Sequence, residues 1–101
     1  MTGPVWRNIY ELSESQIERL DEAEEEMQLM NINKAESLLN SILDEDLNCI
    51  PALNNLAHLY GRYLSDFDKA IEYYDLVLKL EPENIWARDE RRRYRRYSNY
   101  D

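Results

Sequence analysis

The stretch AHLYGRYLSDFDKAIEYYDLVLKLEPEN at residues 57–84 has a diverged counterpart earlier in the chain, AEEEMQLMNINKAESLLNSILDEDLN at residues 23–48. In both stretches, apolar residues recur at steps of three and four, which is the spacing of one face of an α-helix. An internal period of about 34 residues is the signature of a helical repeat. The sequence therefore predicts two copies of one helical unit.

The alignment of the two copies contains a one-residue step. A shift of 34 residues places Ala23 on Ala57, whereas a shift of 35 residues places Ala35 on Ala70. The second copy therefore holds one extra residue, which we expect in the turn at residues 62–65. The alanines have a physical purpose in such a unit, because small side chains let two paired helices approach closely.

The first copy is predicted to be a helical hairpin at residues 13–48. Ser13 and Gln16 form a capping-box pattern at the start of its first helix. Residues 31–33 interrupt the apolar pattern, and residues 45–48 end the second helix.

The second copy is predicted to be a hairpin at residues 49–83. Pro51 suits the first turn of a helix, and Ser65 or Asp66 can cap the next one. Pro82 ends that helix, because the residue before a proline is driven away from helical geometry.

Two segments flank the hairpins. Residues 84–101 are rich in arginine, and we expect a fifth helix there that begins at residue 83 or 84 and ends near residue 97. Residues 1–12 are too apolar to remain in water, so we expect a docked arm or a short helix. Their apolar side chains are Val5, Trp6, Ile9, Tyr10 and Leu12.

The composition is that of a globular, helix-rich chain. Of 101 residues, 44% are hydrophobic and 33% are charged, and two glycines and three prolines allow few turns. No apolar run approaches the roughly 20 residues of a membrane span, and no secretory signal pattern is visible. The single cysteine, Cys49, fits a reducing compartment and is expected to be buried. We therefore expect a cytoplasmic protein.

The residues do not favour an enzyme. His58 is the only histidine and Cys49 the only cysteine, so no second histidine or cysteine exists to build a zinc site, and no glycine-rich loop exists to hold a phosphate. The carboxylate run at residues 24–26 is typical of a solvated helix face. We expect no catalytic residue, no metal and no cofactor.

The second copy resembles the tetratricopeptide repeat, whose pattern is W-x-x-L-G-x-x-Y, A-x-x-x-F and P. The matching positions are Leu53, Leu56, Ala57, Tyr60, Ala70, Tyr74 and Pro82. Residues 16–48 match less closely. The resemblance implies an all-α fold, an α-solenoid of two tetratricopeptide-like helical hairpins with a C-terminal capping helix.

The same resemblance implies a scaffold or adaptor that binds a peptide or protein in a concave groove lined by the first helix of each hairpin. The groove positions would be Leu20, Glu24, Met27, Asn54, Asn55, His58, Arg62, Trp86 and Arg93, with Glu90 also on the fifth helix. Some members of the family hold the C-terminal carboxylate of chaperones at five such positions. Only Asn55 matches that set, so we expect no such clamp.

The arginine-rich segment leaves alternatives open. Six arginines fall between residues 88 and 96 against two acidic residues, whereas residues 1–50 hold 12 acidic and 3 basic side chains. The arginines can form a solvated outer face, bind the acidic half of a second copy in a homo-oligomer, or bind a polyanion such as RNA. The net charge of −9 disfavours nucleic acid. The residues concerned are Arg88, Arg91, Arg92, Arg95 and Arg96.

Overall fold

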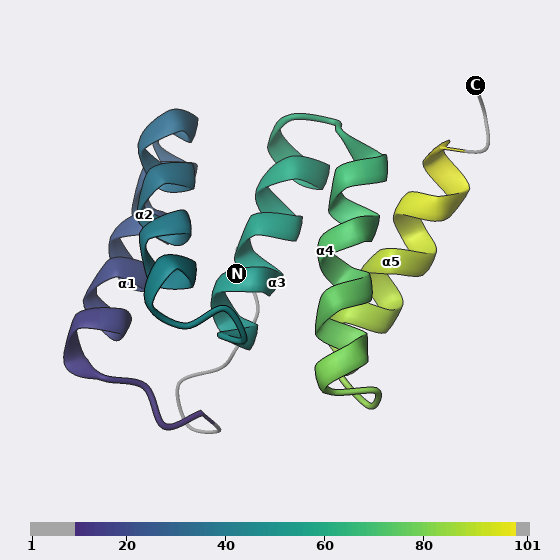
Figure 1. Ribbon diagram of the computed structural model, residues 1–101. Helices are drawn as coiled ribbons and strands as arrows, with labels where there is room; N and C mark the ends of the chain where they lie inside the picture. Colours follow the sequence, from purple (N-terminus) through teal and green to yellow (C-terminus); the bar gives the residue numbers. More distant parts are fainter. Residues whose placement is uncertain (1–9, 99–101) are drawn as a thin grey trace.

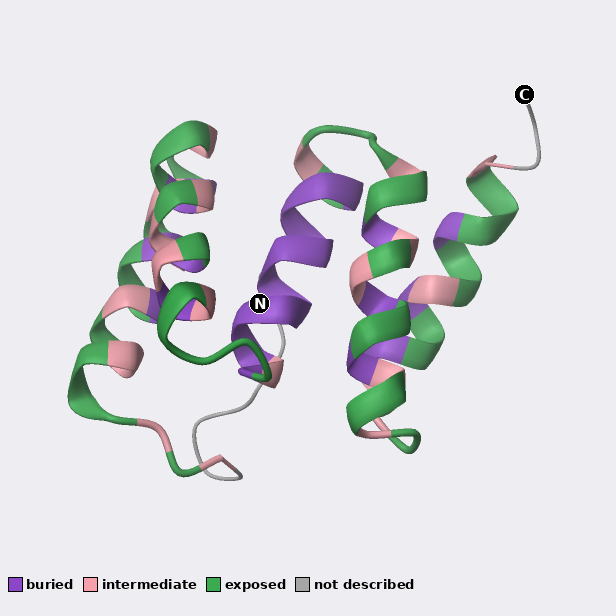
Figure 2. Cartoon of the chain, viewed as in Figure 1, coloured by how far each residue is buried: buried purple, intermediate pink, exposed green. Residues whose placement is uncertain are grey.

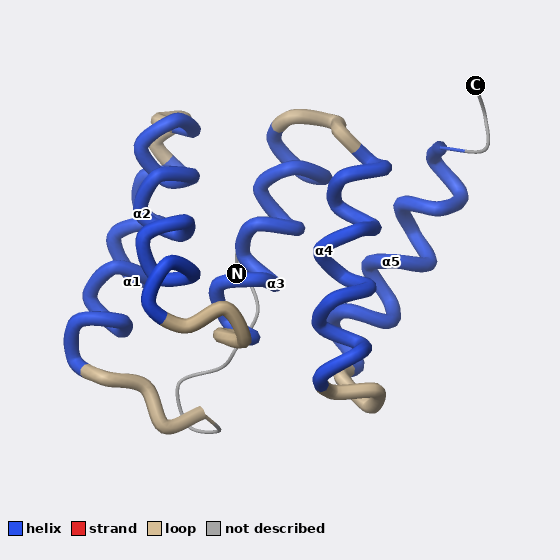
Figure 3. Tube along the Cα trace, in the orientation of Figure 1, coloured by secondary structure: helices blue, strands red, loops and turns tan. Residues whose placement is uncertain are grey.

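The computed structural model describes residues 10–98, and within them it contains five α-helices, one π-helical turn and no strand (Figures 1 and 3). This confirms the predicted all-α fold. Residues 1–9 of the predicted arm and residues 99–101 of the tail lie outside the described part. The elements are α1 (Glu14–Gln28), α2 (Ile32–Glu45), α3 (Ile50–His58), the π-helical turn η1 (Leu59–Tyr63), α4 (Phe67–Leu80) and α5 (Ile85–Ser98).

The helices form a short stack in which α1 packs on α2, α3 on α4, and α4 on α5. The capping box predicted at the start of α1 is confirmed. The Ser13 hydroxyl accepts a hydrogen bond from the backbone N–H of Gln16, and the Gln16 side chain accepts one from the N–H of Ser13. At the other end of the stack, the Asn84 side chain accepts a hydrogen bond from the N–H of Ala87 and so caps α5.

The chain before α1 contacts the far end of the stack. Tyr10 and Leu12 pack against the hydrophobic core. The Tyr10 hydroxyl donates a hydrogen bond of 2.8 Å to Glu81, which lies 71 residues away in the turn between α4 and α5. Burial and the Glu81 carboxylate raise the pKa of the Tyr10 hydroxyl well above its usual value, so the hydroxyl remains a donor.

The turn between α1 and α2 closes with a Schellman motif. Met30 has a φ of 66°, and its N–H donates to the carbonyl of Met27, while the N–H of Asn31 donates to the carbonyl of Glu26. A left-handed backbone conformation is unfavourable for a residue with a Cβ atom. Met30 is 64% exposed, so its side chain offsets little of this cost by packing.

Met30→Gly is therefore expected to raise the free energy of unfolding by about 0.5–1 kcal/mol, because glycine adopts this conformation without steric cost. Urea titration followed by circular dichroism measures the change. Glu25→Gly is the matched control, since Glu25 is exposed in the interior of α1, and there glycine is expected to cost about 1 kcal/mol. A loss of stability for Met30→Gly would contradict the proposed effect of the turn.

The π-helical turn η1 accommodates the extra residue of the second copy. In the first hairpin the N–H of Asn31 donates a hydrogen bond to the carbonyl of Glu26. The equivalent bond in the second hairpin joins the N–H of Asp66 to the carbonyl of Tyr60, and it spans one more residue of the chain. The N–H of Leu64 also donates to Leu59, the spacing of a π-helix. The extra residue is thus accommodated in η1. The last two residues of η1 overlap the turn at residues 62–65 where the sequence predicted the insertion.

The core runs along the whole stack and includes the four alanines of the repeat, which have no exposed surface. The helix α3 is buried along most of its length, as Figure 2 shows, because it lies between α2 and α4 and also contacts α1. Cys49, at the start of α3, is 3% exposed, which confirms its predicted burial. Burial raises the pKa of its thiol.

The adjacent tyrosines of α4 lie in different environments. Tyr74 is fully buried, whereas Tyr73 is half-buried and stacks on Tyr60 with ring centroids 5.6 Å apart. The Lys69 ammonium group lies over the Tyr60 ring, 4.8 Å from its centroid. The Tyr60 hydroxyl donates a hydrogen bond to Glu36 of α2. These contacts join α2, η1 and α4 on one side of the stack.

Candidate functional site

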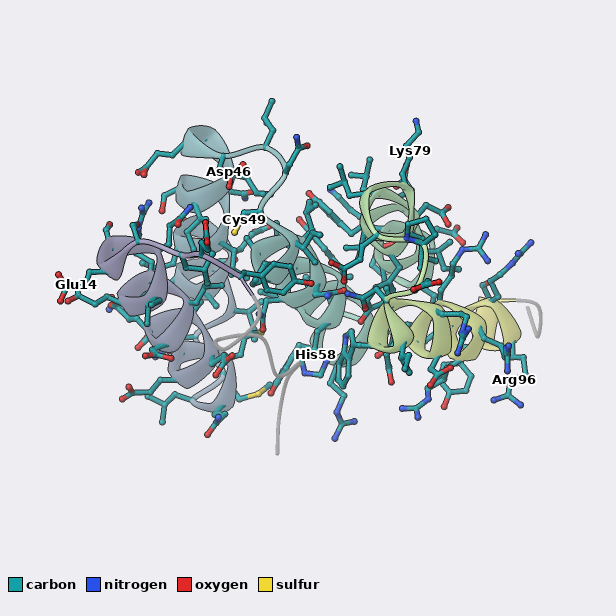
Figure 4. All side chains as sticks on the ribbon, turned by 90° about the horizontal axis from the view of Figure 1, so that it is seen from below. Glu14, Asp46, Cys49, His58, Lys79 and Arg96 are labelled. Carbon is teal, nitrogen blue, oxygen red and sulfur yellow. The ribbon has the colours of Figure 1, made fainter. Side chains whose placement is uncertain are left out.

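The residues that the sequence assigned to a groove come from α1, α3, η1 and α5. Figure 4 shows His58 on the side of the stack where α1 and α5 lie, while Lys79 projects from α4 on the other side. We call the side formed by α1, α3, η1 and α5 the inner face, and the side formed by α2 and α4 the outer face.

Several predicted groove residues are not available on the inner face. Leu20 is fully buried and Met27 is 2% exposed, and both belong to the hydrophobic core. Glu24, on the same helix, is half-buried. The structure therefore assigns Leu20 and Met27 to packing rather than to a contact surface, because α1 directs its apolar stripe toward its neighbours in the stack.

The polar residues of α3 are also buried. Asn55 has no exposed surface, and its side-chain N–H₂ donates a hydrogen bond of 2.8 Å to the carbonyl of Pro51 one turn earlier. Asn54 is 4% exposed, and the side-chain oxygens of both asparagines have no hydrogen-bond partner. Asn55 thus acts on the backbone of its own helix, and little of either asparagine is presented to a partner.

His58 and Trp86 connect α3 to α5. The His58 ring is 8% exposed and makes edge-to-face contacts with Tyr63 and Trp86, with centroids 5.8 Å apart in each case. Trp86 is half-buried, so part of its indole ring is accessible on the inner face. The two rings hold the start of α5 against α3.

Arg62 and Arg93, by contrast, are brought together. They line one pocket of about 220 Å³ between η1, the start of α4 and α5, although they are 31 positions apart in the sequence. Both side chains are exposed. Arg93 lies 3.4 Å from the carboxylate of Glu90, whereas no carboxylate of the described residues forms an ion pair with Arg62.

Aromatic rings form the wall of this pocket. Phe67 stacks on Tyr94 with centroids 5.6 Å apart, and Tyr97 contacts both rings. Burial raises the pKa of Tyr94 to about 12, with Glu90 acting in the same direction and the two arginines opposing it. The Tyr94 hydroxyl is therefore neutral at physiological pH and can donate a hydrogen bond.

Sequence reasoning did not identify the aromatic wall or Ser65, which also lines the pocket. One signal could have indicated it, because the one-residue step in the repeat marks the only place where the two hairpins differ in length. Gly61 is the second signal. A Cβ atom at this position would lie 2.5 Å from Cζ of Tyr94, so only glycine lets this ring lie against η1.

The remaining arginines of α5 lie outside the pocket. Arg91 pairs with Asp75 of α4, and Arg88 lies 4.0 Å from Asp89. Arg92, Arg95 and Arg96 are exposed, and Arg96 projects from the far end of α5 in Figure 4. Binding of a polyanion or of a second copy by these side chains stays a prediction.

No group of three histidine, cysteine or acidic side chains within residues 10–98 could hold a metal ion. None of the helices in this range combines the length and apolar composition that crossing a bilayer requires.

Comparison with known proteins identifies the second hairpin. Residues 50–84 match the family model of the tetratricopeptide repeat. A comparison with curated proteins found no significant match. Tetratricopeptide repeats in general mediate protein–protein interactions and are not catalytic. Residues 50–84, which comprise α3, η1 and α4, therefore form a tetratricopeptide repeat.

Proposed function

We propose that this chain is a non-catalytic interaction module, which holds a peptide or protein segment along the inner face between Trp86 and the pocket at Arg62 and Arg93. The observation that carries this proposal is the pocket itself. It combines two exposed guanidinium groups with a wall of aromatic rings at the junction of η1, α4 and α5. Arginine, tyrosine and tryptophan are the residues most enriched where proteins bind one another.

The proposal narrows the groove expected from the sequence. With Leu20 and Met27 in the core and Asn55 bonded to its own helix, the predicted groove residues that remain exposed are Arg62 of η1 and Arg93 of α5. Trp86 is partly exposed, and Arg62 contributes a charge that forms no ion pair with a carboxylate of residues 10–98. A partner segment can supply an apolar side chain to pack on Trp86 and an anionic group to bind Arg62.

The outer face offers a less suitable surface. Some of its polar groups are engaged within the chain, since Tyr60 donates to Glu36 and Lys69 lies over the Tyr60 ring. A depression of about 270 Å³ is present there, lined by Lys69, Glu72, Tyr73 and Leu76, with charges of both signs. Leu76 in this depression provides the matched control position for a crosslinking experiment.

Photo-crosslinking tests the proposal. Tyr97 on the inner face and Leu76 on the outer face are each 46% exposed, and each lines a pocket. We expect p-benzoyl-L-phenylalanine in place of Tyr97 to form a discrete adduct in the cells that produce the protein, and the same group in place of Leu76 to form none. Adducts at position 76 alone, or equal adducts at both positions, would place the partner elsewhere.

A further inference from the structure

The pocket at Arg62 and Arg93 lies where the second hairpin carries its extra residue. The π-helical turn η1 carries Arg62, and the pocket there is also lined by Arg93 of α5. Gly61 allows the Tyr94 ring to approach η1 closely enough to form part of the aromatic wall of the pocket. The corresponding turn between α1 and α2 has no π-helical turn, since α1 ends in an ordinary Schellman motif.

The charges of the pocket favour an anion. Two guanidinium groups line it, and the nearest carboxylate in contact with either is Glu90, 3.4 Å from Arg93. Asp66 caps α4, where its side chain accepts a hydrogen bond of 3.2 Å from the N–H of Lys69. Within residues 10–98, Glu90 pairs with Arg93, and no carboxylate forms an ion pair with Arg62.

The shape of the pocket also suits an oxyanion. The planar guanidinium group presents paired N–H donors that match two oxygens of a carboxylate or a phosphate. Ser65 adds a hydroxyl, and Phe67, Tyr94 and Tyr97 provide an apolar wall beside the two guanidinium groups. Chloride or another spherical ion would use this fork of donors less fully.

We propose that the pocket between Arg62 and Arg93 binds the oxyanion, carboxylate or phosphate, of an acidic or phosphorylated side chain in a partner peptide. This inference rests on the proposed function, since it specifies the chemistry of the partner at the same site. The residues that occupy the five clamp positions implied by the family resemblance are Leu20, Glu24, Asn55, Trp86 and Glu90, and none of them lines this pocket.

Three synthetic peptides test this proposal on the full chain. Each is Gly-Gly-X-Gly-Gly with blocked ends, so that no terminal carboxylate is present, and X is phosphoserine, glutamate or glutamine. We follow binding by shifts of backbone amide signals at about 50 mM salt, where charge contacts are least screened. The phosphoserine peptide is expected to bind more tightly than the glutamate peptide because it carries more charge. The glutamine peptide is expected not to bind, and the shifts are expected to centre on Gly61 and Ser65.

Arginine variants assign the binding to the pocket. Arg62→Gln is expected to weaken the phosphoserine peptide by roughly tenfold or more, which is the usual effect of losing a hydrogen bond to a charged group. Arg62→Lys is expected to give an intermediate loss, because it keeps the charge and loses the paired donors. Arg95→Gln is the matched control, since it removes the same charge from an exposed position outside the pocket, and we expect a change of less than about twofold there.

Three results would overturn the inference. These are equal binding of the glutamine peptide, equal weakening by Arg62→Gln and Arg95→Gln, and the absence of amide shifts with all three peptides. Failure here is distinguishable from failure of the proposed function. If position 97 still forms a crosslinked adduct while no peptide binds, the inner face holds a partner through other chemistry. Preferential binding of phosphoserine would identify a phosphorylated ligand, and comparable binding of glutamate an acidic one.

Discussion

Tyr74→Ala is expected to lower the free energy of unfolding by about 3–5 kcal/mol, the usual cost of truncating a buried aromatic residue. Tyr74 has no exposed surface, and its ring stacks on Tyr94 of α5 with centroids 6.3 Å apart. Truncation would leave a cavity where α4 supports α5. A domain of this size is stable by only about 5–15 kcal/mol, so the variant loses a large share of its stability. Urea titration followed by circular dichroism measures the loss.

Tyr74→Phe separates the ring from the hydroxyl. The hydroxyl is buried without a hydrogen-bond partner, and burial raises the pKa of this tyrosine far above its usual value. Removing an unsatisfied buried group costs little and can stabilise, so we expect a change within about 0.5 kcal/mol of zero. A loss of about 2 kcal/mol or more in the phenylalanine variant would show that the hydroxyl makes a hydrogen bond after all.

Gly61→Ala is expected to lower the free energy of unfolding by about 1–3 kcal/mol, the usual cost of overpacking. Helix propensity alone predicts the opposite sign, because alanine is favoured over glycine in a helix by about 1 kcal/mol. The contact with Tyr94 decides the outcome, since a Cβ atom at position 61 would lie 2.5 Å from Cζ and 2.6 Å from Cε2 of that ring. Tyr94 is 4% exposed and stacked on Phe67, so it has little room to move.

A double-mutant cycle with Tyr94→Leu tests this explanation. With the ring removed, Gly61→Ala no longer meets an obstacle, and we expect it to become neutral or to stabilise by up to about 1 kcal/mol. Urea titration of the four proteins gives the coupling energy between positions 61 and 94. The same cost for Gly61→Ala in both backgrounds would show that the backbone of η1, and not the Tyr94 ring, forbids a side chain at this position.

The hairpins could be predicted from the sequence because their determinants are local. The step from a shift of 34 to one of 35 residues, the capping box at Ser13 and the stop at Pro82 each depend on neighbours within a turn or two of helix. Adjacent residues are rotated by about 100° around a helix, which accounts for Tyr74 in the core beside Tyr73 nearer the surface. Such signals act through backbone geometry, which is the same wherever the helix lies.

The candidate site could be predicted only in part. Helical periodicity indicates the direction in which a side chain points, but not how much protein lies in that direction. The groove positions implied by the resemblance to the tetratricopeptide repeat therefore included Leu20 and Asn55, which the stack buries, together with Arg62, which the stack leaves exposed. The contact of Tyr10 with Glu81, across 71 residues, left no local pattern at all.

The sequence by itself determined the helices, their order, their caps and the pairing of each hairpin, because these follow from interactions between residues close in the chain. Only the tertiary structure decided which polar residues are accessible and that Arg62 and Arg93 share a pocket. That outcome depends on how α5 crosses η1 and α4, and thus on the fit of the Tyr94 ring against Gly61. Packing of this kind is a property of surfaces that meet in space, and it has no period in the sequence.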